Sequence, residues 1–142
     1  MKRLQMLQVL LEREQKRRDD ARAALQSTQR QAEAQRQQAD GLTTYRGEYC
    51  AKWSANFQRA ASIEILRSYH GFLGRLDQAI TQQQQVLAHA QRQVELARQR
   101  VVEREIRVAT VERLIQRRQA LLARAADRRE QKNLDEMAAR LV

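Results

Sequence analysis

The residues of this 142-residue chain that could carry out chemistry are few, and they lie far apart. His70 and His89 are the only histidines, and neither has a cysteine or a carboxylate at metal-ligand spacing. The single cysteine, Cys50, cannot form an internal disulfide, which fits a reducing cytosol. Neither a glycine-rich phosphate loop nor a GxSxG motif occurs. The sequence therefore predicts no metal site, no cofactor and no enzymatic activity.

Electrostatic binding is the chemistry that remains, because the formal net charge is +10. Acidic residues are interleaved with basic residues along the whole chain, as they are on a solvated helical surface. Leucine-zipper factors instead concentrate their basic residues before a short zipper. We therefore expect no nucleic-acid partner, and a basic helical nucleic-acid binder or adaptor coiled coil is kept as an alternative.

The elements that must position these side chains are helices. The chain has no proline, four glycines and six aromatic residues, which argues against sheets and tight turns. Between Leu66 and Ala125 a heptad seam advances by alternating steps of three and four, and 15 of its 18 positions are apolar. Such a narrow stripe predicts a long helix that pairs with one other helix.

A second, weaker seam occupies residues 4–42. It is followed by four aromatic residues at steps of four, Tyr45, Tyr49, Trp53 and Phe57. Ser62 can cap a new helix through its hydroxyl, and Glu64 would then lie in the first turn, where the helix dipole favours an acid. These features predict a break between two helices near residue 60.

We therefore predict an all-α fold, an antiparallel two-helix coiled-coil hairpin that forms a single domain over residues 1–142. Helix one should span about residues 2–58, the turn about 59–62 and helix two about 63–138, with residue i facing roughly residue 120 − i. Beyond about Arg118 helix two outruns its partner and leaves a C-terminal helical overhang. A parallel dimer is the competing arrangement, but all six aromatic residues lie within 28 positions, as expected for a hairpin tip. We thus expect a monomer when the protein is alone.

Polar residues interrupt both seams at corresponding places. Glu14 and Arg18 should lie roughly opposite Arg104. A polar layer of this kind fixes the register of a coiled coil at some cost in stability.

Two surfaces could bind partner proteins. Phe72 falls one position off the seam, where it could anchor a partner or could pack over the tip with Trp53 or Phe57. The overhang keeps apolar residues with basic residues around them, and exposed apolar side chains on an unpaired helix often mark a binding surface. A frayed tail is the alternative. The candidate residues of the overhang are Leu121, Leu122, Arg124, Arg128, Arg129, Lys132, Leu134 and Met137.

Four stretches spread along the chain carry a resemblance to a known family. They are the leucine-rich start Leu4-Leu7-Leu10-Leu11, the segment 45–49 (YRGEY), the segment 69–80 (YHGFLGRLDQAI) and the ending within residues 129–138 (REQKNLDEMA). Their order and spacing over essentially all 142 residues resemble the flagellar type III export FliJ family.

This resemblance implies a non-enzymatic cytoplasmic stalk and escort protein, peripheral to the inner membrane at the flagellar base and not inserted into it. The implied partners are the export ATPase FliI, engaged by the end that carries both termini, the export gate protein FlhA, and export chaperones. The resemblance puts Phe72, Leu76, Ala79 and Gln83 in the stretch that contacts the gate. The stalk protein of virulence-type III secretion systems is the close alternative.

Overall fold

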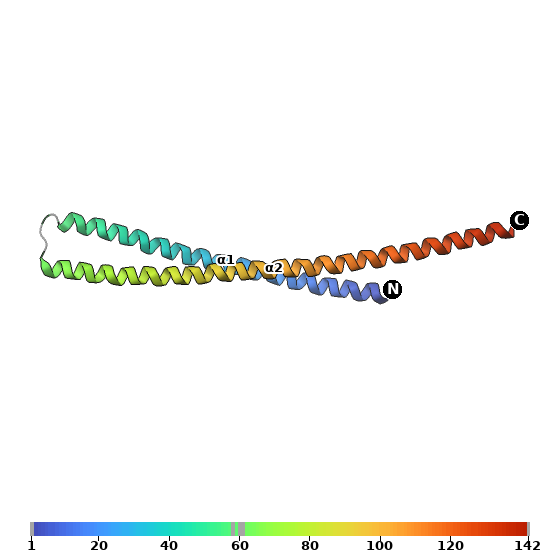
Figure 1. The fold of residues 1–142 in the computed structure, drawn as a ribbon, viewed down its shortest axis with the longest axis horizontal. Coiled ribbons are helices and arrows are strands. Elements are labelled where there is room, and N and C mark those ends of the chain that lie inside the picture. Colours follow the sequence, from blue (N-terminus) through green and yellow to red (C-terminus); the bar gives the residue numbers. More distant parts are fainter. Residues whose placement is uncertain (1, 58, 60–61, 142) are drawn as a thin grey trace. The chain divides into compact units, whose positions relative to one another are not determined.

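Two long helices make up the protein in the computed structural model, which describes residues 2–57, 59 and 62–141 (Figure 1). Helix α1 spans Lys2–Phe57 and helix α2 spans Ile63–Arg140. The two helices pack against each other, and no strand occurs in the part of the chain that the structure describes. The predicted all-α helical hairpin is confirmed.

Ser62 begins α2 in the predicted manner. Its Oγ accepts a hydrogen bond of 3.3 Å from the backbone N–H of Ile65, and its carbonyl accepts one of 3.1 Å from Leu66. Glu64 lies in the first turn of the helix. Of the predicted turn, Ala60 and Ala61 lie outside the described residues, as does Gln58 at the predicted end of helix one.

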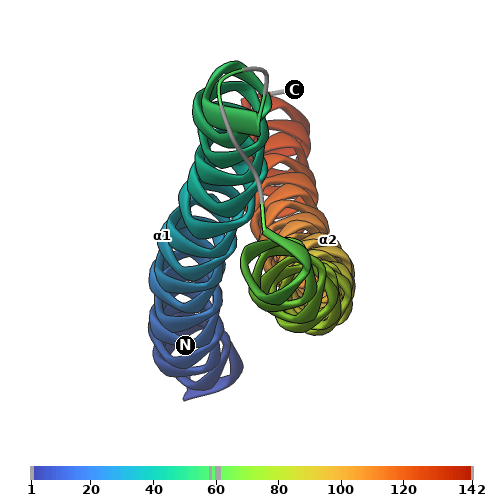
Figure 2. The same cartoon turned by 90° about the vertical axis from the view of Figure 1, so that its left-hand side faces the viewer.

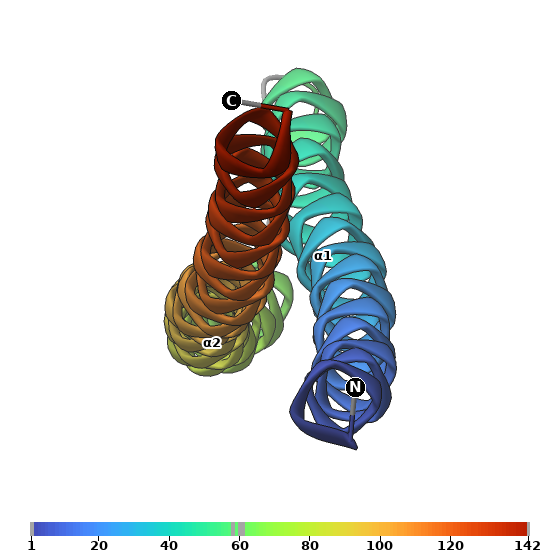
Figure 3. The same ribbon diagram turned by 90° about the vertical axis from the view of Figure 1, so that its right-hand side faces the viewer.

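The chain divides into two compact units, and each helix contributes to both. Unit 1 combines residues 1–22 of the chain with residues 100–142, and unit 2 comprises residues 23–99. Figure 2 looks toward the end of α1 and the start of α2 in unit 2, and Figure 3 looks toward the last turns of α2 in unit 1. The single-domain organisation over residues 1–142 stays a prediction.

In unit 2 the antiparallel register is visible in side-chain contacts between the helices. The Gln83 amide on α2 donates hydrogen bonds to the side chain and the backbone carbonyl of Gln35 on α1, at 2.7 and 3.2 Å. Arg46 of α1 pairs with Asp77 of α2, closer to the tip. Since a later residue of α1 meets an earlier residue of α2, the two helices run antiparallel, near the expected register.

The seam of unit 1 is the best-buried part of the described chain. Val108 and Val111 of α2 keep only 4% and 6% of their surface exposed. Glu14 of α1 is buried in the same unit with 7% exposed, and its Oε2 has no hydrogen-bond partner among the described residues. The half-buried Arg104 also has a buried Nη1 without such a partner. Unit 1 therefore places buried charged groups within its apolar seam.

One seam position differs from the sequence pattern. Tyr45 is the first of the four aromatic residues that follow the weaker seam, but it is 48% exposed, and Arg46 is half-buried instead. The aliphatic part of an arginine side chain can cover apolar surface while its guanidinium reaches outward. Here the guanidinium reaches Asp77, and this contact between the helices favours Arg46 over Tyr45 at the interface.

The predicted overhang is present in unit 1, where α2 continues past the N-terminal end of α1 (Figure 1). Every residue from Gln119 to Leu141 is exposed. This part of α2 therefore lies largely outside the packed interface of unit 1.

Shortening one buried seam residue should destabilise the hairpin. Val108→Ala should lower the free energy of unfolding by about 2 kcal/mol, because two buried methyl groups are lost and a cavity forms. Val102→Ala is the matched control, since Val102 lies on the same helix and is 55% exposed. Urea denaturation followed by circular dichroism measures both changes. Equal losses in the two variants would contradict the observed burial.

Replacing the buried carboxylate should have the opposite effect. Glu14→Leu should raise the free energy of unfolding by roughly 1–3 kcal/mol, because a buried charge with an unpartnered oxygen gives way to apolar packing. Glu12→Leu, at an exposed position of the same helix, should change it by less than about 0.5 kcal/mol. The same denaturation experiment reports both values. A destabilised Glu14→Leu variant would show that the carboxylate stabilises the seam.

Candidate functional site

The tip of the hairpin in unit 2 gathers the aromatic residues of both helices. The ring of Tyr49 on α1 lies 4.6 Å from that of Phe72 and 5.6 Å from that of Tyr69, both on α2. Tyr69 also contacts Phe57 and Trp53, with centroid distances of 5.0 and 6.2 Å. The predicted meeting of the aromatic residues between the two helices is confirmed. Pairs at these distances stabilise a structure beyond the area they bury.

Phe72 is part of this cluster. Its ring lies against Tyr49 and, at 6.5 Å, against Tyr45, and not against Trp53 or Phe57 as the packing alternative supposed. Phe72 is half-buried, and its neighbour Tyr45 is 48% exposed. The residue thus packs within the hairpin while one side of the Phe72–Tyr45 pair remains open to solvent.

The other three residues expected to contact the export gate face the partner helix to different degrees. Leu76 is buried with 6% exposed, and Ala79 is half-buried. Gln83 is half-buried and donates a hydrogen bond to Gln35, as described above. Leu76 and Gln83 therefore hold the two helices together, and Phe72 is the member of the set beside an exposed aromatic surface.

The charged groups of the tip also join the helices. Arg46 donates two hydrogen bonds to the carboxylate of Asp77, at 2.5 and 3.4 Å. These bonds raise the pKa of Arg46 and lower the pKa of Asp77. A hydrogen bond with Cys50, together with desolvation, raises the pKa of Tyr69. Asp77 therefore stays ionised and Tyr69 stays neutral near neutral pH. Neither pKa is shifted toward neutrality, as a general acid or base would require.

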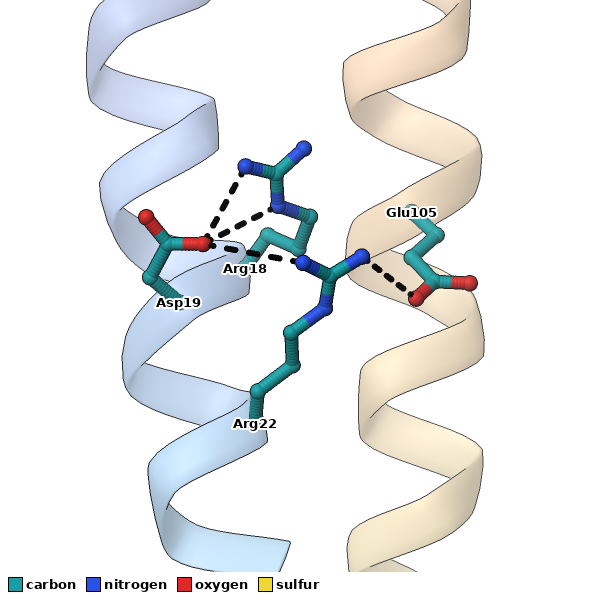
Figure 4. A network of polar contacts seen from close by, with 4 residues as sticks. All are labelled: Arg18, Asp19, Arg22 and Glu105. Atoms are coloured by element: carbon teal, nitrogen blue, oxygen red, sulfur yellow. Dashed lines mark hydrogen bonds and ion pairs between the residues drawn. The ribbon is translucent and has the colours of Figure 1, made fainter.

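A second polar cluster lies in unit 1 (Figure 4). Arg22 of α1 donates a 3.1 Å hydrogen bond across the interface to Glu105 of α2. Asp19 accepts hydrogen bonds of 3.1 and 3.2 Å from Arg18 and forms a 4.0 Å ion pair with Arg22. Exposed ion pairs of this kind contribute little to stability, so their main effect is on register and on the distribution of surface charge.

All candidate residues of the overhang are exposed to solvent. Leu121, Leu134 and Met137 are 56%, 57% and 61% exposed, and Leu122 is 39% exposed. The basic candidates are exposed as well, and none of them forms an ion pair within the described residues; they are Arg124, Arg128, Arg129 and Lys132. Apolar and basic groups on this unpaired helix are therefore free to meet a partner.

The sequence patterns missed an open groove between the helices of unit 1. Its apolar lining consists of Met6 and Leu7 of α1 with Leu114 and Leu121 of α2, and its volume is about 350 Å³. Met6 and Leu114 lie off the seam, and both are exposed. Exposed apolar residues beside the seam on both helices were the signal that could have indicated this groove.

Two further features bear on the chemistry of the site. No group of three or more histidine, cysteine, aspartate or glutamate side chains that could hold a metal ion occurs within the described ranges. Neither α1 nor α2, as far as they are described, is long and apolar enough to cross a membrane.

Comparison with known proteins gives one result. A model of the family described as "Flagellar FliJ protein" matches residues 1–142, the whole chain. No curated protein and no solved structure matches the chain significantly. A family match of this extent, on a chain that folds as a two-helix hairpin, means that the protein belongs to the flagellar FliJ family.

Proposed function

We propose that this protein is the non-enzymatic stalk of the flagellar type III export apparatus. In this role it binds the export ATPase FliI and stimulates assembly and activity of the ATPase ring. It also links the ring to the export gate protein FlhA and escorts export chaperones. The observation that carries the proposal is the family match over all 142 residues. A monomeric protein in the cytoplasm, held at the inner membrane only by these partners, fits the role.

The ATPase contact is assigned to the overhang. Support comes from its exposure, since every residue from Gln119 to Leu141 is exposed on the part of α2 that extends past α1. Apolar side chains supply contact area there, and the surrounding basic side chains can meet carboxylates. The contact set is Leu121, Leu122, Arg124, Arg128, Arg129, Lys132, Leu134 and Met137.

The gate contact is assigned to the tip stretch of Phe72, Leu76, Ala79 and Gln83. Within this set Phe72 is the contacting side chain, because it lies beside the exposed ring of Tyr45. Leu76 and Gln83 support it from the interface between the helices. Aromatic anchors of this kind are common hot spots in protein interfaces.

Placing charge on the overhang should abolish the ATPase contact. The double variant Leu134→Asp with Met137→Asp should reduce stimulation of the ATPase by roughly tenfold, because two apolar contacts are lost at a hot spot. The matched control is Val102→Asp with Ile106→Asp, two residues of the same helix that are 55% and 60% exposed. Phosphate release by the ATPase, measured against the concentration of each variant, gives the comparison. Full stimulation of the ATPase by the overhang variant would show that the ATPase contact lies elsewhere on the protein.

Truncating the aromatic anchor should weaken gate binding. Phe72→Ala should reduce affinity for the cytoplasmic part of the gate protein at least fivefold, that is by about 1 kcal/mol or more. Because Phe72 packs 4.6 Å from Tyr49, the variant should also lose roughly 1–3 kcal/mol of stability. Leu73→Ala, at the half-buried neighbouring seam position, controls for that loss. Calorimetry at a temperature where both variants are folded should show weak binding only for Phe72→Ala, and equal affinities would refute the assignment.

A further inference from the structure

The groove of unit 1 is an apolar surface that the proposed ATPase and gate contacts leave largely unused. Met6 and Leu7 come from the first turns of α1, and Leu114 and Leu121 come from α2. Met6 is 71% exposed, Leu121 56% and Leu114 42%, so three of these four side chains leave a large part of their apolar surface open to a ligand.

The charge around this apolar lining has one sign. The remaining lining residues are Arg3, Arg117 and Arg118, and no acidic residue lines the groove within the described chain. In Arg118 the Nε atom is buried and has no hydrogen-bond partner among the described residues. None of these three arginines forms an ion pair among the described residues, and a carboxylate is the strongest acceptor for a guanidinium group. The charge of the groove therefore favours an acidic ligand.

The shape of the groove favours a helix. It lies between two antiparallel helices and is open along one side, so a third helix about 10 Å wide can lie against both. Amphipathic helices bind in apolar grooves through residues spaced at i, i+3, i+4 and i+7. Apolar residues at this spacing would contact Leu114 and Leu121, and acidic residues beside them would meet the three arginines.

We propose that this groove binds an acidic amphipathic helix of a partner protein. The partner's leucine-like side chains fill the space between Met6, Leu7, Leu114 and Leu121, and its aspartates or glutamates pair with the arginines at the rim. This surface lies in unit 1, which also carries both termini, but it goes beyond the contact set proposed for the ATPase, because it involves α1 and lies outside most of the overhang. Leu121 is the one residue that the two surfaces share.

A membrane surface is a poorer occupant for the same groove. A helix that lies on a bilayer contacts it with one outward face. The lining of this groove includes the half-buried Leu7 and Arg118, which a flat surface would not reach between two helices. A ligand narrow enough to enter the groove reaches both.

The probe is a fluorescent 18-residue model helix, with leucines at the stated spacing and glutamates on both flanks. A control peptide carries lysines in place of the glutamates. Fluorescence anisotropy with the full-length protein should show the acidic peptide binding at least tenfold more tightly than the basic one. Its affinity should fall as salt is added, because charge attraction contributes to binding.

Variants in and beside the groove test where the peptide binds. Arg117→Glu should lower the affinity for the acidic peptide at least fivefold, and Leu114→Asp should lower it about tenfold. Arg113→Glu and Ile106→Asp are matched controls on exposed positions of the same helix, outside the groove, and they should change the affinity less than twofold. Circular dichroism of each variant shows that the helices are intact.

Other results would overturn the proposal. Equal weakening by Arg113→Glu and Arg117→Glu would reveal only diffuse charge attraction. The protein could instead fail to bind the acidic peptide but bind phosphatidylglycerol vesicles. If the Leu114→Asp variant then lost vesicle binding, the groove would be a membrane-binding surface. The variant Leu134→Asp with Met137→Asp should still bind the peptide, so a failed ATPase assignment and a failed groove assignment give different results.

Discussion

In a two-helix hairpin each helix can bury only the stripe of side chains that faces its partner. This constraint accounts for the spacing of apolar residues in α2, where the buried positions include Leu76, Ala97, Val101, Val108 and Ile115. It also accounts for the absence of any large side chain with less than 2% of its surface exposed among the described residues. Stability must come from the length of the stripe, because its depth is limited to one layer.

The polar positions within the stripe have a separate role. Gln83 donates hydrogen bonds to Gln35 across the interface of unit 2, so this pair marks one register without leaving a charge buried. In unit 1 the buried groups of Glu14 and Arg104 include atoms that lack partners. Such groups lower stability, and they disfavour alternative pairings in which they would face an entirely apolar neighbour. The seam thus combines apolar burial for stability with polar positions that select the pairing.

Most of the fold follows from patterns that act locally along the chain. Alternating steps of three and four predict helix and seam, and Ser62 predicts the start of α2 through its hydroxyl. The local pattern could not predict that Arg46, and not Tyr45, lies at the interface, because this depends on Asp77, a residue 31 positions away from Arg46. The groove of unit 1 was missed for the same reason, since it exists only where exposed residues of two helices lie side by side. The candidate gate residues show the limit of spacing alone: it placed Phe72 beside the seam, but it did not identify Tyr49 as its nearest aromatic partner.

The unpaired end of α2 has a consequence for how its helix is maintained. About 22 residues, roughly 33 Å of helix at 1.5 Å per residue, continue with little tertiary packing. A helix of that length in water depends on its intrinsic propensity and on contacts within one turn, such as the hydrogen bond between Gln131 and Asp135. Its backbone hydrogen bonds therefore open at a much lower free energy than those of the paired seam, and local unfolding can begin at this end and spread inward. A partner that covers the overhang supplies the missing packing, so that binding and helix formation in this segment are thermodynamically coupled.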